Sequence, residues 1–175
     1  MDELSWGFIG VISGAVIGAS TSIITTILTG NNTFRLQQDA NNQERMEKAR
    51  AFQRETLLAV QETLNDTLRS MMQIHLADLK AEKAGGKWGR NLIDNELDEN
   101  DRVSKRHLQI LTERIADDAL RQGLSELHDT IHSCNRATSK DEAIKQVNNS
   151  VAQADEFMKH LGLVLRSLYG PTGRG

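Results

Sequence analysis

The hydrophobic and polar positions of this 175-residue chain divide it into an uncharged N-terminal segment and a longer polar region with helical periodicity. No Asp, Glu, Lys or Arg occurs from Leu4 to Phe34, and 43 of the 45 charged residues follow that run. Residues 6–28 would be about 34 Å long as a helix, enough to cross a hydrocarbon core of roughly 30 Å. We therefore predict one N-terminal transmembrane helix over 6–28, preceded by a short extracytoplasmic end, residues 1–5.

The basic residues around this segment predict its orientation. None precedes it, whereas Arg35, Arg45, Lys48 and Arg50 follow it closely. Basic flanks of a membrane span stay on the cytoplasmic side. We expect a single-pass protein of the cell membrane, with its N-terminus outside and its C-terminal region in the cytoplasm. The single cysteine, Cys134, fits a reducing compartment.

Small residues recur along one face of the predicted span. Such residues let two membrane helices approach closely, so the pattern predicts self-association into a homo-oligomer of glycine-zipper type. The hydroxyl groups in the same set could instead line a narrow polar path through the membrane, and the sequence leaves both readings open. The predicted self-association face consists of Gly7, Gly10, Gly14, Gly18, Ser22, Thr25 and Thr29.

Helix-forming residues continue beyond the span. Residues 29–51 are polar and rich in helix formers, which predicts a solvated helical stalk. From Phe52 onward apolar residues fall three or four apart, which predicts a helix with one apolar face. Gly85 and Gly86 are expected to end this helix. A further helix is expected from about Glu99 to Asn135. Its apolar face shifts by one position near Gly123, which predicts a bend there.

The last helix has the most regular pattern in the chain. Ser139 and Glu142 form a capping box at its start, and Gly170 followed by Pro171 ends it. Apolar residues in 3,4 spacing mark a coiled-coil seam or one stripe of an antiparallel bundle. That seam consists of Ile144, Val147, Val151, Ala154, Met158, Leu161, Leu165 and Leu168. The predicted fold is all-α: span, stalk, a cytoplasmic antiparallel helical bundle over 52–169 with coiled-coil character, and a flexible tail, 170–175.

Two groups of residues invite a chemical interpretation. The connector after the stalk helix carries Lys83, Lys87, Trp88 and Arg90, which could contact an anion such as a nucleotide phosphate, although the stretch does not match a phosphate-loop pattern. His128 and His132 share one helix face, but no third ligand is evident. We therefore predict no metal site, no cofactor and no catalytic residue.

Composition narrows the function classes. Aromatic residues make up 4% of the chain and proline occurs once, which argues against a β-sandwich or β-barrel. A net charge of −3 does not indicate binding to duplex nucleic acid. The sequence contains no nucleophile or cofactor motif that would predict an enzyme. We expect a membrane-anchored oligomeric scaffold or interaction module. Its partners would be the lipid bilayer, other copies of the chain, and a cytoplasmic protein or an anionic ligand. The alternative is a membrane effector that senses an anionic nucleotide-type signal and perturbs the membrane through its assembled spans.

Overall fold

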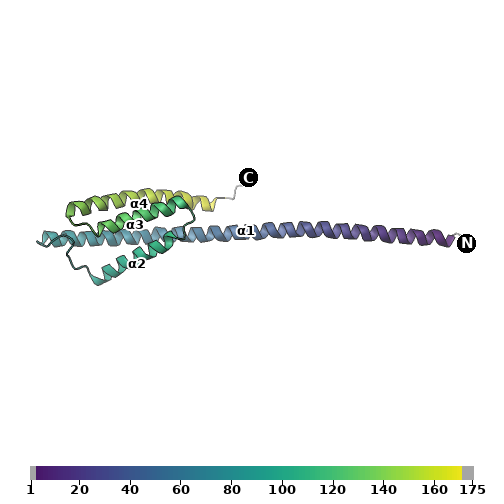
Figure 1. Ribbon diagram of the computed structural model, residues 1–175, viewed down its shortest axis with the longest axis horizontal. Helices are drawn as coiled ribbons and strands as arrows, with labels where there is room; N and C mark the ends of the chain where they lie inside the picture. The colour runs from purple at the N-terminus through teal and green to yellow at the C-terminus, as the bar shows by residue number, and fades with distance from the viewer. Residues whose placement is uncertain (1–2, 171–175) are drawn as a thin grey trace. The chain divides into compact units, whose positions relative to one another are not determined.

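The computed structural model describes the backbone of residues 3–170 and the side chains of residues 29, 30 and 32–170. It contains four α-helices and, within these residues, no strand, so the all-α prediction is confirmed (Figure 1). The helices are α1 (Glu3–Lys83), α2 (Asn95–Thr112), α3 (Asp118–Cys134) and α4 (Lys140–Tyr169). The chain divides into two units, Met1–Ala49 and Arg50–Gly175.

The first unit contributes helix but no core among its described side chains. Every described side chain from residue 29 to 49 is exposed to solvent. Among the described residues no helix is both long and apolar enough to cross a membrane. The predicted span over 6–28 lies outside the described side chains, and so does its self-association face apart from Thr29, which is exposed.

The second unit is an antiparallel four-helix bundle. Residues 50–83 of α1 pack with α2, α3 and α4, and successive helices run in opposite directions (Figure 1). Each helix turns one apolar stripe inward, because burial removes apolar surface from water. The core combines Leu57, Val60, Leu64 and Met71 of α1, Leu108 and Leu111 of α2, Leu120, Leu124, Leu127 and Ile131 of α3, and Val147, Ala154, Phe157 and Leu161 of α4.

The prediction of one helix from about Glu99 to Asn135 is wrong, because a reversal of the chain separates α2 from α3. The carboxylate of Asp117 accepts a hydrogen bond from Leu120 N at 2.8 Å and so starts a new helix. The Gln53 side chain holds the turn from α1, since it donates to the Arg114 carbonyl and accepts from Ala116 N, both at 2.9 Å. The shift in the apolar pattern marks this reversal, whereas Gly123 lies inside α3.

The other helix ends follow local sequence signals. Gly85 adopts a φ of 87°, a left-handed conformation that favours glycine, directly after α1. Ser139 Oγ accepts from Glu142 N at 3.3 Å, which confirms the predicted cap of α4. The Glu142 carboxylate reaches back to Thr138, whose backbone N donates to it at 3.0 Å.

Candidate functional site

The predicted seam of α4 is divided between the bundle interior and its surface. Val147, Ala154 and Leu161 are buried in the core, and Met158, Leu165 and Leu168 are partly buried beside it. Ile144 and Val151 are exposed, at 37% and 43%. The interior face of α4 is completed by Ala143, Ser150 and Phe157, one position away from predicted seam residues. A seam between separate chains stays a prediction.

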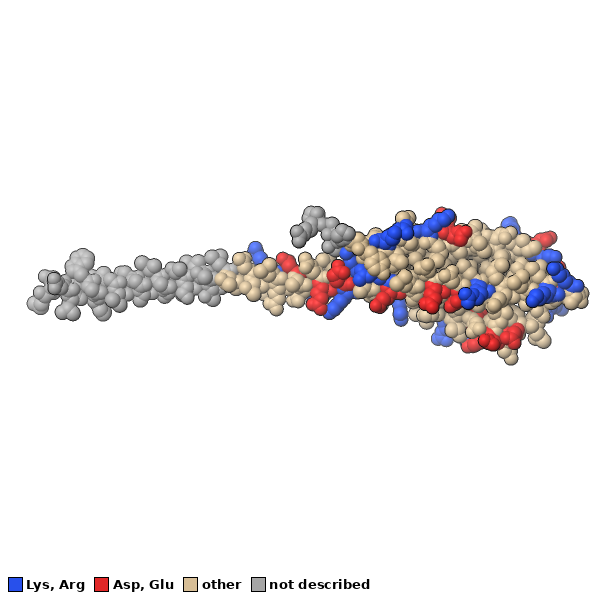
Figure 2. All heavy atoms as spheres, turned by 180° about the vertical axis from the view of Figure 1, so that it is seen from behind, with Lys and Arg blue, Asp and Glu red and all other residues tan. Residues whose placement is uncertain are grey.

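The predicted anion contact lies at the end of α1 and in the connector between α1 and α2. Lys83, Lys87 and Arg90 are exposed, and Figure 2 shows Lys and Arg side chains gathered at one end of the bundle. The Trp88 ring is half-buried and meets the His75 ring edge-on, with 5.5 Å between the ring centroids. Trp88 therefore fixes the connector against α1, and an anion contact by the three basic side chains stays a prediction.

Asp78 also ties this connector to α1. Burial raises the pKa of the Asp78 carboxyl, while the charge of His75 and a hydrogen bond from the Gly89 backbone act in the opposite direction. Gly89 itself adopts a φ of 66°, a conformation that side chains other than glycine rarely adopt. The connector is thus held by specific contacts at Trp88 and Gly89.

A buried ion pair joins polar groups inside the bundle. Lys105 Nζ lies 2.6 Å from Asp101 Oδ2, and both side chains are about nine-tenths buried, at 10% and 11% exposure. Asn135 Nδ2 donates to the same oxygen at 3.2 Å, which links α2 to the end of α3. Asp101 Oδ1 is buried and has no hydrogen-bond partner among the described residues. Nothing in the sequence identifies this pair as buried, because a charged i,i+4 pair is usually found on a helix surface.

Cys134 and His128 lie in the part of α3 near that ion pair. Cys134 Sγ is 3.3 Å from Ser150 Oγ of α4, and burial raises the pKa of its thiol. His128 and His132 stack with 6.1 Å between their ring centroids. Burial and, secondly, the charge of His132 lower the pKa of His128. Among the described residues, no group of three or more His, Cys, Asp or Glu side chains is placed to hold a metal ion.

Among the described residues, a groove between α3 and α4 is well suited to binding. It encloses about 460 Å³ and is lined by Ala119, Gly123 and Glu126 of α3 and by Gln153, Glu156, Phe157 and His160 of α4. Its apolar part is formed by small residues facing an aromatic ring, and its charged part consists of two carboxylates. Gln153 Oε1 is buried there without a donor among the described residues.

Sequence reasoning missed this groove, although it singled out Gly123. A glycine inside a helix costs about 1 kcal/mol relative to alanine, so such a glycine can indicate a packing or binding requirement. A Cβ atom added at Gly123 would lie 3.6 Å from Phe157 Cδ2, in ordinary van der Waals contact. An alanine would therefore fit at this position, so packing between α3 and α4 does not itself require the glycine.

Comparisons of this chain with protein-family models, with curated proteins and with solved structures find no match.

Proposed function

We propose that this chain is a membrane-anchored scaffold whose helical bundle binds a protein partner through the α3–α4 groove. The observation that carries the proposal is the groove itself, with its aromatic floor at Phe157, its carboxylates at Glu126 and Glu156, and the buried acceptor at Gln153. Amphipathic helices dock into grooves of this kind, with apolar side chains inside and polar groups at the rim.

The chemistry of the groove indicates what it would bind. Two carboxylates favour a cation, and a buried carbonyl oxygen without a donor favours an N–H group. Phe157 and Ala119 offer apolar contact next to these groups. An arginine or lysine side chain flanked by apolar residues on one helix face meets all three requirements.

Membrane attachment is supported by the charge distribution of the sequence. The run without charge from Leu4 to Phe34 contains the proposed anchor over 6–28, and the basic residues after it favour a cytoplasmic bundle. The small-residue face from Gly7 to Thr29 supports self-association of the anchors. In this proposal the anchor concentrates the bundles at the membrane surface.

The anchor is tested by alkaline extraction of membranes from cells that express the full chain. The wild type should stay in the membrane pellet, whereas I12R/V16R should be largely extracted, because each central arginine costs about 2.5–3.5 kcal/mol in translocon insertion. N41R/N42R is the matched control and should remain in the pellet. Extraction of the wild type would contradict the anchor.

The groove is tested by site-specific photo-cross-linking in the same cells. A benzophenone amino acid at His160, inside the groove, should give discrete cross-linked bands in the membrane fraction. The same probe at Asn149, an exposed position of α4 outside the groove, is the control. Equal patterns from both positions, or no bands from His160, would contradict binding through the groove.

The effector function is a second candidate, supported by the gathering of basic side chains beside the α1–α2 connector (Figure 2). An anionic ligand held by Lys83, Lys87 and Arg90 would be the signal in that case. Depolarisation of the membrane on expression, abolished by the triple substitution of these residues to alanine, would favour it over the scaffold. An unchanged membrane potential would count against it.

A further inference from the structure

We propose that the α3–α4 groove of one chain receives helix α2 of a second copy, with Arg106 as its anchor and Val103 and Ile110 on either side. The inference rests on the proposed function, because it names the partner of the same groove. It makes the bundle itself, in addition to the predicted membrane face, a site of self-association.

The groove has the length of two helical turns. Its lining residues span Ala119 to Glu126 on α3 and Gln153 to His160 on α4, so each side covers eight residues. At about 1.5 Å per residue, this length is roughly 12 Å. A helix that fills the groove therefore needs about three side chains, spread over two turns, that complement the apolar and charged parts of the groove.

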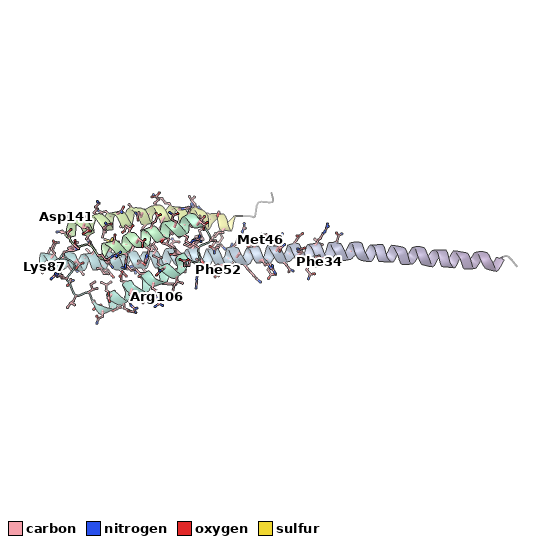
Figure 3. All side chains as sticks on the ribbon, viewed as in Figure 1. Phe34, Met46, Phe52, Lys87, Arg106 and Asp141 are labelled. Atoms are coloured by element: carbon pink, nitrogen blue, oxygen red, sulfur yellow. The ribbon has the colours of Figure 1, made fainter. Side chains whose placement is uncertain are left out.

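Helix α2 carries such a set on its outer face. Val103 and Ile110 are 52% and 46% exposed, and Arg106 lies between them in the sequence and is also exposed. Residues at i, i+3 and i+7 fall on one face of a helix, so the three side chains form one stripe. Figure 3 labels Arg106 on α2. The buried residues of α2, such as Leu108 and Leu111, lie on its other side.

The two surfaces complement each other in charge and hydrogen bonding. A guanidinium group carries five N–H donors and no acceptor, so one arginine can serve several oxygens at once. In the groove the accessible oxygens are those of the Glu156 carboxylate. Gln153 Oε1, which has no donor within the described residues, is buried, so its side chain would have to turn to accept from the guanidinium. Val103 and Ile110 would cover the apolar surface beside Phe157.

The proposed contact joins two different surfaces of the chain, and we expect it to be heterologous, because a reciprocal two-fold dimer would require both surfaces to lie in one patch. Each copy would then offer one α2 stripe and one groove, and assembly would continue into rings or rows instead of stopping at a dimer. A two-fold symmetric contact between identical surfaces would give dimers only. This difference provides the test.

The first experiment uses cysteine cross-linking of the full chain in native membranes, in a C134S background. A short bismaleimide replaces a disulfide, because paired arginine and glutamate side chains leave their Cα atoms too far apart for an S–S bond. A chain with both R106C and E156C should give a ladder of dimers, trimers and larger species. Chains with R106C mixed with chains carrying E156C should give dimers only.

The control is Q109C/E156C, whose first position is also exposed on α2 but is turned about 60° around the helix from Arg106 and about 100° from Ile110. Its cross-linking should be at least fivefold weaker than that of R106C/E156C. Equal yields from both pairs would overturn the proposal. Dimers from R106C alone, as strong as those from the mixture, would also overturn it by indicating a symmetric α2–α2 contact.

The second experiment reverses the charges. The measured quantity is the fraction of full chain found in large species in mild detergent. R106E and E156R should each reduce this fraction at least fivefold. The double variant R106E/E156R should restore it to within twofold of the wild type. Circular dichroism checks that each variant stays helical. If these changes leave the assembly unaltered while His160 still cross-links to another protein, the scaffold stands and this inference fails.

Discussion

Two ion pairs, one in each unit of the chain, have the same sequence spacing and the same N–O distance but differ in how far they are exposed to solvent. Lys48 lies 2.6 Å from Glu44 in the first unit, and Lys105 lies 2.6 Å from Asp101 in the bundle, each four residues apart on one helix. The side chains of the first pair are 75% and 62% exposed, whereas those of the second are 10% and 11% exposed. The spacing and the N–O distance are thus the same, whereas the second pair is buried and also receives the hydrogen bond from Asn135.

Residues 29–49 and 50–83 thus belong to one helix, α1, but are helical for different reasons. In the first stretch every described side chain is exposed, so helix propensity and pairs such as Glu44 with Lys48 must supply the stability. In the second stretch Leu57, Val60 and Leu64 are almost fully buried, so tertiary packing supplies it. Matched changes in the two stretches, or in the first stretch and the bundle, should therefore differ in their effect on stability.

The largest effect is expected from breaking the buried pair. Lys105→Met leaves the Asp101 carboxylate buried with Asn135 as its only hydrogen-bond partner among the described residues, and should lower the free energy of unfolding by about 3–5 kcal/mol. Lys48→Met should change it by about 0.5 kcal/mol or less. The measurement is urea unfolding of the full chain in mild detergent, followed by Trp88 fluorescence in a W6F background.

A double variant tests whether the uncompensated Asp101 carboxylate causes the loss of stability. Replacing both charges, as in D101L/K105M, removes the uncompensated carboxylate and should recover most of the stability lost in Lys105→Met. If Lys105→Met and Lys48→Met had equal effects, burial would not be what distinguishes the pairs.

Core packing gives the next effect. Leu124 of α3 has 0% exposure, and Leu124→Ala should cost about 2–5 kcal/mol through lost burial and the cavity that remains. Leu36 is 70% exposed in the first unit, so Leu36→Ala should stay within about 0.5 kcal/mol of the wild type. The same urea titration measures both. A large loss for Leu36→Ala would mean that its side chain is covered, as in an assembled stalk.

A smaller effect is expected where a side chain supports a turn. Gln53→Ala removes the bonds to the Arg114 carbonyl and to Ala116 N, and should cost about 1 kcal/mol. Gln43→Ala, at an exposed position of the first unit, is the control and should have no measurable effect. Hydrogen exchange at Ala116 N should also become faster in Gln53→Ala alone. Unchanged exchange there would contradict a role of Gln53 in holding the turn.

Much of the fold could be predicted from the sequence, because helix starts and stops are local. Gly85 and Ser139 mark the ends of their helices through conformations and hydrogen bonds within a few residues. The break between α2 and α3 was missed because Gln53, which holds that turn, is about sixty residues away in the sequence.

The candidate groove could not be predicted for the same reason. Its walls come from residues of α3 and α4 that lie about thirty positions apart, and only the antiparallel packing brings Gly123 next to Phe157. Ile144 and Val151 fit the heptad pattern as well as Val147 does, but the packing of the bundle leaves their side chains exposed. A periodic pattern identifies a helix face, but the neighbouring helices decide how far that face is rotated toward the core.

The smallest effect is expected in the pH dependence of stability. Burial, the charge of His132 and that of Lys105 lower the pKa of His128 from 6.5, and Asp129 only partly opposes them. As the pH falls, the unfolded chain therefore takes up this proton before the folded chain does, and the free energy of unfolding decreases below about pH 6.5. His128→Gln should flatten this decrease between about pH 5 and 7, measured by urea unfolding at each pH. His107→Gln, an exposed position of α2, is the control and should keep the wild-type slope. A decrease of equal slope in His128→Gln would show that other groups produce it.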